Sequence, residues 1–249
     1  MTLLVDVLEE HGLDSIDVVL FALPGVGDVG KNAVELLNEA NDARTVARFI
    51  HPGLTPLARL DEDGLLAPPH LTAKRIEAEN GTSILAITGR GQPSESFQQH
   101  DFTTQLLKYL SKAGMKEIIV LAGLMSTPEI KEAFAVATTS PHRVHLEEQG
   151  VDVRRDQPSG GAIGMSALMA SLAPLFGLKS VCAMATTVGA SGDVHASIRL
   201  LEFVSKGWNL NIQLPKDATS SLLAKLNELA PNANTDHVRE LMEEPHAFY

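Results

Sequence analysis

Cysteine is almost absent from this sequence of 249 residues, which contains Cys182 alone, and aromatic residues make up only 4% of it. A single cysteine excludes an internal disulfide framework and fits a reducing compartment, and its position in an apolar run predicts a buried filler rather than a nucleophile. No apolar run reaches the roughly 18 residues of a membrane-spanning helix, and Asp6 follows the first residues too soon for a signal peptide. We therefore expect a cytoplasmic protein.

Positive charge is also scarce, because Lys and Arg number 20 against 31 Asp and Glu, which gives a net charge of −11. This excess of acid disfavours nonspecific attraction to nucleic acids and to anionic membranes, so we expect a protein or small-molecule partner. The contents of 44% hydrophobic and 20% charged residues are ordinary for a globular chain, and no linker composition interrupts it. We expect a single domain over residues 1–249, with a helical C-terminal segment from about residue 217.

A glycine-rich loop, Gly25-x-Gly27-x-x-Gly30, follows an apolar segment that begins at Val18 and opens a segment of helical period. This spacing is typical of a dinucleotide-binding turn, which also needs an Asp or Glu about 20 residues further on to bind the ribose hydroxyls. The next apolar segment, Thr45–Ile50, ends instead in His51, and Pro24 before the loop favours a tight turn. We therefore interpret Gly25, Gly27 and Gly30 as a structural strand-to-helix turn without a cofactor; nucleotide binding is the alternative.

Segments of strand and helix character alternate along most of the chain. Asn80-Gly81 is a strong hairpin turn between residues 72–79 and 82–88. A glycine-rich turn at 160–164 leads a helix of small residues, and Asp193 or Ser191 can cap a later helix. The pattern predicts an α/β fold with a mixed, mainly parallel sheet flanked by helices, an inserted hairpin and C-terminal helices. Strands are expected at 16–23, 45–50, 117–122 and 180–187, and helices at 30–40, 94–113, 194–206, 218–229 and 235–243.

Patterns that carry catalytic or metal chemistry are weak in this chain. His142-x-x-His145 followed by Glu147 and Glu148 offers zinc-type ligands, but the spacing is loose and no cysteine accompanies it, so we expect exposed side chains and no metal. No Gly-x-Ser-x-Gly sequence is present, since the segment around Ser166 lacks the second glycine. We expect no catalytic residues.

Four segments together resemble the proteasome-assembly-chaperone family in their order and spacing, over roughly residues 15–215. The resemblance implies a mixed sheet flanked by helices, like that of nucleoside phosphorylases and hydrolases, without catalytic residues. It also implies homo-oligomerisation and docking on the α-subunit ring of the proteasome core particle. The segments are Pro24–Gly30, Gly89–Pro93, Ile118–Met125 and Gly160–Met165, and the block Val194–Leu214 is also similar to the C-terminal block of that family.

The last three residues, Ala247, Phe248 and Tyr249, bear on this implication. Archaeal members of the family carry a C-terminal tripeptide of a hydrophobic residue, Tyr and any residue, whose ring and free carboxylate enter pockets between α subunits. Phe248 stands where Tyr is preferred, so the resemblance implies ring and carboxylate contacts without the hydroxyl. The alternative is an apolar tail that packs on its own domain or frays.

The rival interpretation is a phosphorylase- or hydrolase-like enzyme. Gly164-Met165-Ser166 resembles a nucleoside phosphorylase segment that faces the ribose, and the loop at Gly25–Gly30 could hold a phosphate at a helix N-terminus. However, Ala183–Thr187 lacks the Asn or Asp with which such enzymes recognise the base, and Arg90 is the only arginine beside a loop glycine in the first half of the chain. A non-enzymatic chaperone or binding protein is therefore the preferred interpretation.

Overall fold

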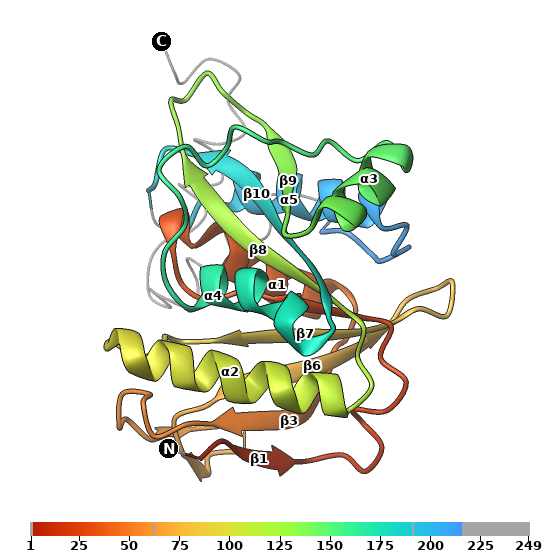
Figure 1. Ribbon diagram of the computed structural model, residues 1–249. Helices are drawn as coiled ribbons and strands as arrows, with labels where there is room; N and C mark the ends of the chain where they lie inside the picture. Colours follow the sequence, from red (N-terminus) through yellow and green to blue (C-terminus); the bar gives the residue numbers. More distant parts are fainter. Residues whose placement is uncertain (1, 62, 191, 216–249) are drawn as a thin grey trace, which may run out of the picture.

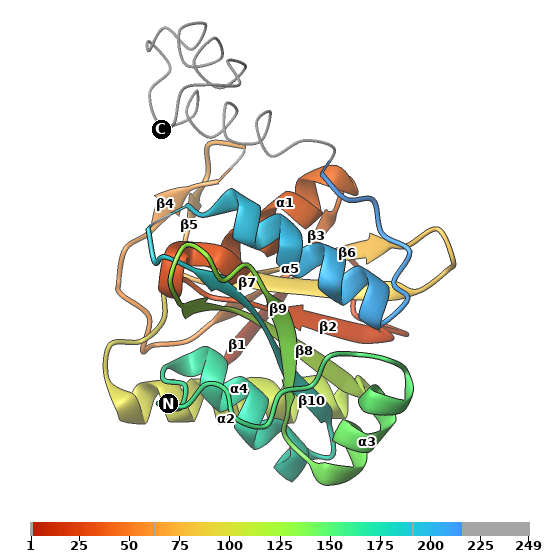
Figure 2. The same ribbon diagram turned by 90° about the horizontal axis from the view of Figure 1, so that it is seen from above.

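The structure, a computed structural model, describes residues 2–61, 63–190 and 192–215, and in this part of the chain an eight-stranded sheet lies between two layers of helices (Figures 1 and 2). The sheet consists of β1 (Leu4–Val7), β2 (Val18–Phe21), β3 (Arg44–Ile50), β6 (Leu71–Glu77), β7 (Ser83–Gly89), β8 (Glu117–Met125), β9 (Ala133–Ala137) and β10 (Lys179–Thr187). A separate two-stranded hairpin consists of β4 (Arg59–Leu60) and β5 (Leu66–Ala67). The helices are α1 (Val29–Ala40), α2 (Ser96–Lys112), α3 (Ser140–Glu148), α4 (Met165–Leu172) and α5 (Val194–Gly207), with 3-10 turns η1 (Val26–Asp28) and η2 (Ala173–Phe176).

The strand order is β1-β3-β6-β7-β2-β8-β10-β9, which confirms the predicted mixed α/β fold. The three pairings at the centre, β7 with β2, β2 with β8 and β8 with β10, are parallel. The four remaining pairings are antiparallel, so parallel pairing is confined to the centre and does not predominate. The predicted hairpin is β6–β7, turned at Asn80-Gly81. It separates β2 from β3, which run in the same direction with two strands between them.

Both faces of the central strands are buried because helices cover each of them. Figure 2 shows α1 and α5 on one side of the sheet and α2 and α4 on the other. Side chains of β2 alternate between the two cores, with Val19 and Phe21 toward α2 and Val18 and Leu20 toward α1. At about 1.5–3 kcal/mol for each large apolar side chain removed from water, these two cores are the main source of stability.

The sheet half made of β1, β3 and β6 is covered differently. Leu71 and Ala73 of β6 and Phe49 of β3 pack in the core beneath α2. The other face of these strands carries polar side chains beside the buried Ile76, and the β4–β5 hairpin lies on this α1 side of the sheet (Figure 2). One half of the sheet is thus enclosed by helices and the other half is covered by a helix on a single face.

The predicted cap at Asp193 and the predicted burial of Cys182 are both confirmed. The carboxylate of Asp193 accepts the backbone N–H of Ala196 at 2.9 Å and caps α5. Cys182 is buried, and burial raises the pKa of its thiol to about 12, which leaves it protonated and unreactive as a nucleophile. No helix in the described ranges has the length and apolar character needed to span a bilayer.

Candidate functional site

The glycine-rich loop packs directly against the carboxyl ends of two central strands. Gly27 has a φ of +62°, and a Cβ there would lie 3.0 Å from Thr187 Oγ1 of β10. A Cβ on Gly30 would lie 2.1 Å from the backbone oxygen of Leu121 in β8, so only glycine allows α1 to approach this strand. Gly25 is extended, and a Cβ there would meet nothing nearer than 3.9 Å. Two of the three glycines are therefore sterically required by packing.

Hydrogen bonds from the β10–α5 connection close this edge of the sheet further. The backbone N–H groups of Gly192 and Asp193 both donate to the Gly27 oxygen at 3.2 Å. The Thr187 hydroxyl donates to the Asp193 carboxylate at 2.6 Å and accepts the Gly189 N–H at 3.2 Å. These polar groups of the loop and of the strand end therefore form hydrogen bonds with one another.

The glycine-rich segment before α4 reaches the same edge. The backbone N–H of Met165 donates to the Gln92 side-chain oxygen at 2.7 Å, which ties Gly160–Met165 to Gly89–Pro93. The Met165 side chain is fully buried in the core beneath α2 and α4, so it faces the core rather than a site for ribose. Arg90, in contrast, is exposed.

The strand end where a dinucleotide site would carry an acid is occupied by His51, whose side chain is completely buried. Its Nδ1 accepts the Gly53 N–H at 3.0 Å, and its Nε2 donates to the Asp101 carboxylate at 3.2 Å, which fixes a neutral tautomer. The ring stacks on Phe102 with centroids 4.6 Å apart. Burial lowers the pKa of His51 more than Asp101 raises it. Since β3 lies three strand spacings from β2, about 14 Å, this position is also remote from the glycine loop.

The expectation of exposed side chains around His142 is wrong for that residue, although His145, Glu147 and Glu148 are exposed. His142 is buried; its Nδ1 donates to the Ser180 backbone oxygen at 3.1 Å, and its Nε2 lies 3.2 Å from a Glu117 carboxylate oxygen. The helical spacing turns His142 inward while the residues that follow it face solvent.

Glu117, the partner of His142, also accepts a hydrogen bond from the Trp208 indole N–H at 2.9 Å. Burial raises the pKa of Glu117, but the neighbouring His142 and the Trp208 N–H together outweigh it and leave the pKa below its ordinary value. Among residues whose positions are described, no three His, Cys, Asp or Glu side chains gather as a metal site would require.

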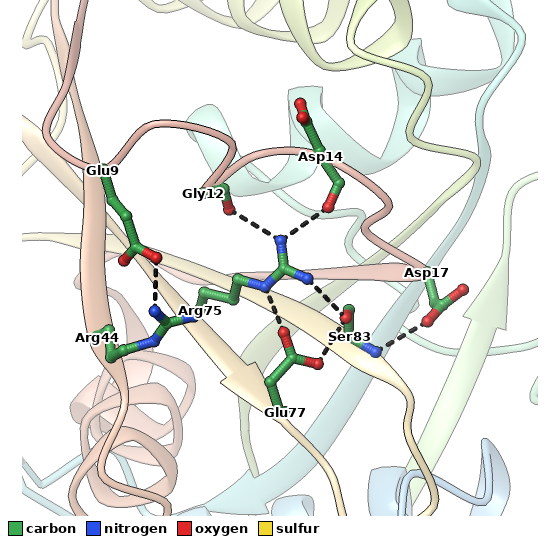
Figure 3. A network of polar contacts seen from close by, with 8 residues as sticks. All are labelled: Glu9, Gly12, Asp14, Asp17, Arg44, Arg75, Glu77 and Ser83. Atoms are coloured by element: carbon green, nitrogen blue, oxygen red, sulfur yellow. Dashed lines mark hydrogen bonds and ion pairs between the residues drawn. The ribbon is translucent and has the colours of Figure 1, made fainter.

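Arg75 of β6 is the centre of a polar network at the opposite edge of the sheet (Figure 3). Its guanidinium donates to the backbone oxygens of Gly12 at 3.3 Å and Asp14 at 2.7 Å, and to the Ser83 hydroxyl at 3.0 Å. It also forms an ion pair with Glu77. The hydrogen bond from Ser83 and the Arg75 guanidinium together hold the pKa of the Glu77 carboxyl below its usual range. This network holds the β1–β2 connection on the sheet.

The sequence-predicted binding residues Ala247, Phe248 and Tyr249 lie outside the described residues, as do the helices expected at 218–229 and 235–243. The structure therefore supplies the fold that precedes them. It places the four segments that carry the family resemblance around the central strands, with three of them meeting at the carboxyl edge.

A model of the PAC2 family matches residues 19–244. The chain belongs to the PAC2 family. This PAC2 chain is similar in structure to PbaB of Pyrococcus furiosus, an archaeal proteasome activator, with 22% identity and a TM-score of 0.73 over 97% of this chain and 99% of that one. It is also similar to PbaA of the same organism, an archaeal homolog of proteasome-assembly chaperone, with 22% identity and a TM-score of 0.69 over 96% and 98% of the two chains.

A curated relative, the uncharacterized protein MJ1210 of Methanocaldococcus jannaschii, is 24% identical over 201 residues, which are 79% of this PAC2 chain and 76% of that protein. The predicted family resemblance is confirmed by the family match, and the structural similarities confirm the shared fold.

Proposed function

We propose that this PAC2 protein is a non-enzymatic, cytoplasmic binding protein that docks on the α ring of the proteasome core particle. The observation that carries the proposal is family membership over residues 19–244, together with a fold shared over nearly the whole length of PbaB and PbaA. The docking element is the terminal sequence Ala247-Phe248-Tyr249, which combines a small apolar residue, an aromatic ring and a carboxylate.

The absence of enzymatic activity is supported by how the carboxyl edge of the central strands is used. An enzyme at this edge would need free donors and a polar side chain aimed at substrate. Thr187 and Asp193 are instead bonded to each other, Gly27 is packed against β10, and Met165 lies in the core. A phosphate-dependent cleavage assay over a panel of nucleosides should give no turnover above background; turnover would establish the enzyme.

Self-association is the second element of the proposal. Large apolar side chains are exposed on β1 and the β4–β5 hairpin, among them Leu4, Leu60 and Leu66, the last two about 70% exposed. Exposed apolar side chains of this size are often covered in an assembly, and identical chains form closed symmetric oligomers most readily. Light scattering should give a mass well above the 26.7 kDa of one chain; that of a monomer at every concentration would reject it.

The test of docking is a titration of proteasome core particles with the full chain and with tail variants. Phe248→Ala should weaken binding by roughly two orders of magnitude, because a buried ring and a charge-assisted contact together contribute about 2–4 kcal/mol. Extension beyond Tyr249 should weaken it similarly, since the carboxylate is displaced. Phe248→Tyr is the matched control and should bind at least as tightly as the unchanged chain. Unchanged binding of both damaging variants would rule out the tail as the docking element.

A further inference from the structure

A cavity of about 800 Å³ lies over the helix-free face of β3 and β6, walled by the β4–β5 hairpin and the loop after β7. Its volume is within the range of about 300–1,000 Å³ that is typical of small-molecule sites. One resemblance segment, Gly89–Pro93, contributes the loop after β7 to its lining, and the rest of the lining comes from residues outside the four segments. The cavity lies in the antiparallel half, on the side of the sheet opposite α2.

The floor of the cavity is set by strand register and by a bulge. Arg48 of β3 is opposite Thr72 of β6, and Thr45 is opposite Lys74, so all four side chains lie on one face. Thr45 and Arg48 are three residues apart and would point to opposite faces of a regular strand. The register shift between Thr45 and Ala47 brings both onto the cavity floor.

The same bulge places two successive residues on the other face of the strand. Val46 and Ala47 are adjacent in sequence, yet both are fully buried in the core beneath α2. The irregularity therefore aims two polar side chains at the cavity without a loss of core packing.

The β4–β5 wall is fastened to the floor by one ion pair. Arg48 binds the Asp61 carboxylate at 3.0 Å. The other oxygen of Asp61 accepts the backbone N–H groups of Leu65 at 2.9 Å and Asp63 at 3.1 Å, which shapes the hairpin turn. These backbone hydrogen bonds, with Arg48, hold the pKa of Asp61 below its usual range. The positive charge of Arg48 is thus compensated by Asp61, at the base of the β4–β5 hairpin.

Three further cations line the cavity from three separate elements: Arg59 from β4, Lys74 from β6 and Arg90 from the end of β7. None of them has a hydrogen-bond or ion-pair partner within residues 2–61, 63–190 and 192–215. Among the described residues of the lining, Asp63 is the acid that remains besides Asp61. The lining therefore carries excess positive charge in a chain whose net charge is −11. Such a field concentrates anions in a recess.

We propose that this cavity binds a small anion, one or more phosphate or carboxylate groups on an apolar body. Lys74 and Arg90 pair with the anionic groups, and the threonine hydroxyls of the floor supply neutral donors. Leu54, Leu57 and Pro68 on the lining contact the apolar part. Lys74 and Arg90 stand at the middle of β6 and beyond the end of the neighbouring strand, so an extended ligand can contact both.

The test is a calorimetric titration of the full chain at low salt with phenyl phosphate and, separately, with phthalate. These two probes distinguish a phosphate ligand from a carboxylate ligand, and benzyl alcohol is the neutral control. Lys74→Met and Arg90→Gln should each weaken binding of the preferred probe about tenfold, as the loss of a charge-assisted contact does. The matched control is Lys112→Met, which removes the same charge from α2 on the opposite face of the sheet and should leave affinity unchanged.

Binding of either anion that is weakened by the two cavity variants and not by Lys112→Met supports the site. Absence of saturable heat with both anions, or equal weakening by all three variants, overturns it. Arg90 lies in an exposed loop, so Arg90→Gln gives a second result should Lys74→Met affect folding. The proposal is independent of the docking function, because binding of Lys74→Met to proteasome α rings should equal that of the unchanged chain.

Discussion

The two halves of the sheet differ in how their faces are covered. In the half built of β7, β2, β8 and β10, helices bury both faces, and the glycine loop closes the carboxyl edge by backbone contact. In the half built of β1, β3 and β6, α2 covers one face, and the other face carries a recess beneath a short hairpin beside the buried Ile76. The motif that resembles a nucleotide-binding turn lies in the closed half, whereas the recess of the open half is lined by Arg59, Lys74 and Arg90.

The difference teaches that packing alone can require a glycine-rich motif. Gly30 and Gly27 remove side chains so that a helix can touch a strand, which in a nucleotide-binding fold would let a pyrophosphate approach. A cavity large enough for a small ligand lies where no helix covers the sheet, and a second one of similar volume lies beside the carboxyl end of β10 and α5.

Substitution of the glycines in the closed half should have the largest effect on stability. Gly30→Ala places a Cβ against the Leu121 carbonyl and should destabilise the fold by about 3 kcal/mol or more, because neither backbone can yield without separating α1 from β8. Gly25→Ala is the control and should change the free energy of unfolding by less than about 0.5 kcal/mol. Urea unfolding measures both; equal effects would mean that the loop is not closed by packing.

Within the open half, the adjacent cations Lys74 and Arg75 of β6 should contribute very differently to stability. Arg75→Met leaves four acceptors of the network without their donor and should cost about 2–3 kcal/mol. Lys74→Met removes a cation that holds nothing in place and should change stability by less than about 0.5 kcal/mol. Chemical denaturation of both variants decides this; a cost for Lys74→Met near that of Arg75→Met would make its charge structural.

The smallest expected effect is a pH dependence due to His51. Burial lowers its pKa below 6.5 in the folded protein, so below about pH 6.5 the unfolded chain binds the proton more readily and stability falls as pH falls. His51→Asn keeps an acceptor near Nδ1 but cannot titrate. It should flatten the loss of stability between about pH 7 and pH 5 by about 1 kcal/mol.

The matched control for this pH experiment is His195→Asn, because His195 is exposed on α5. Unfolding free energies measured at both pH values give the slope for each variant. If the slope of His51→Asn equals that of the unchanged chain, the buried tautomer assigned to His51 is incorrect.

Local sequence patterns were sufficient to predict β2, α1, the β6–β7 hairpin and the cap at Asp193, because each depends on neighbouring residues. Strand order was beyond local patterns, since a period of two says which face is buried but not which strand lies alongside. The hairpin therefore gave no indication that it separates β2 from β3.

The site features that were missed depend on distant partners. His51 forms a hydrogen bond with Asp101, 50 residues further along the sequence, and His142 lies beside Glu117 of another element. The cavity depends on a bulge, and nothing in the run from Arg44 to Ile50 marks one extra residue. Lys74 shares its strand face with Thr72 and Ile76, and such a mixed face does not mark a binding site in the sequence.

The strand order also constrains how the chain reaches its fold. The β6–β7 hairpin closes locally and needs nothing but its own turn, so it can form within microseconds. The buried strand β2 can complete its pairing only later, because its partners are distant in sequence: Val18 pairs with Ile84 of β7 and Phe21 pairs with Val120 of β8. During synthesis the ribosome must release the chain beyond Val120 before β2 has both neighbours, and until then its apolar side chains depend on the hairpin for cover.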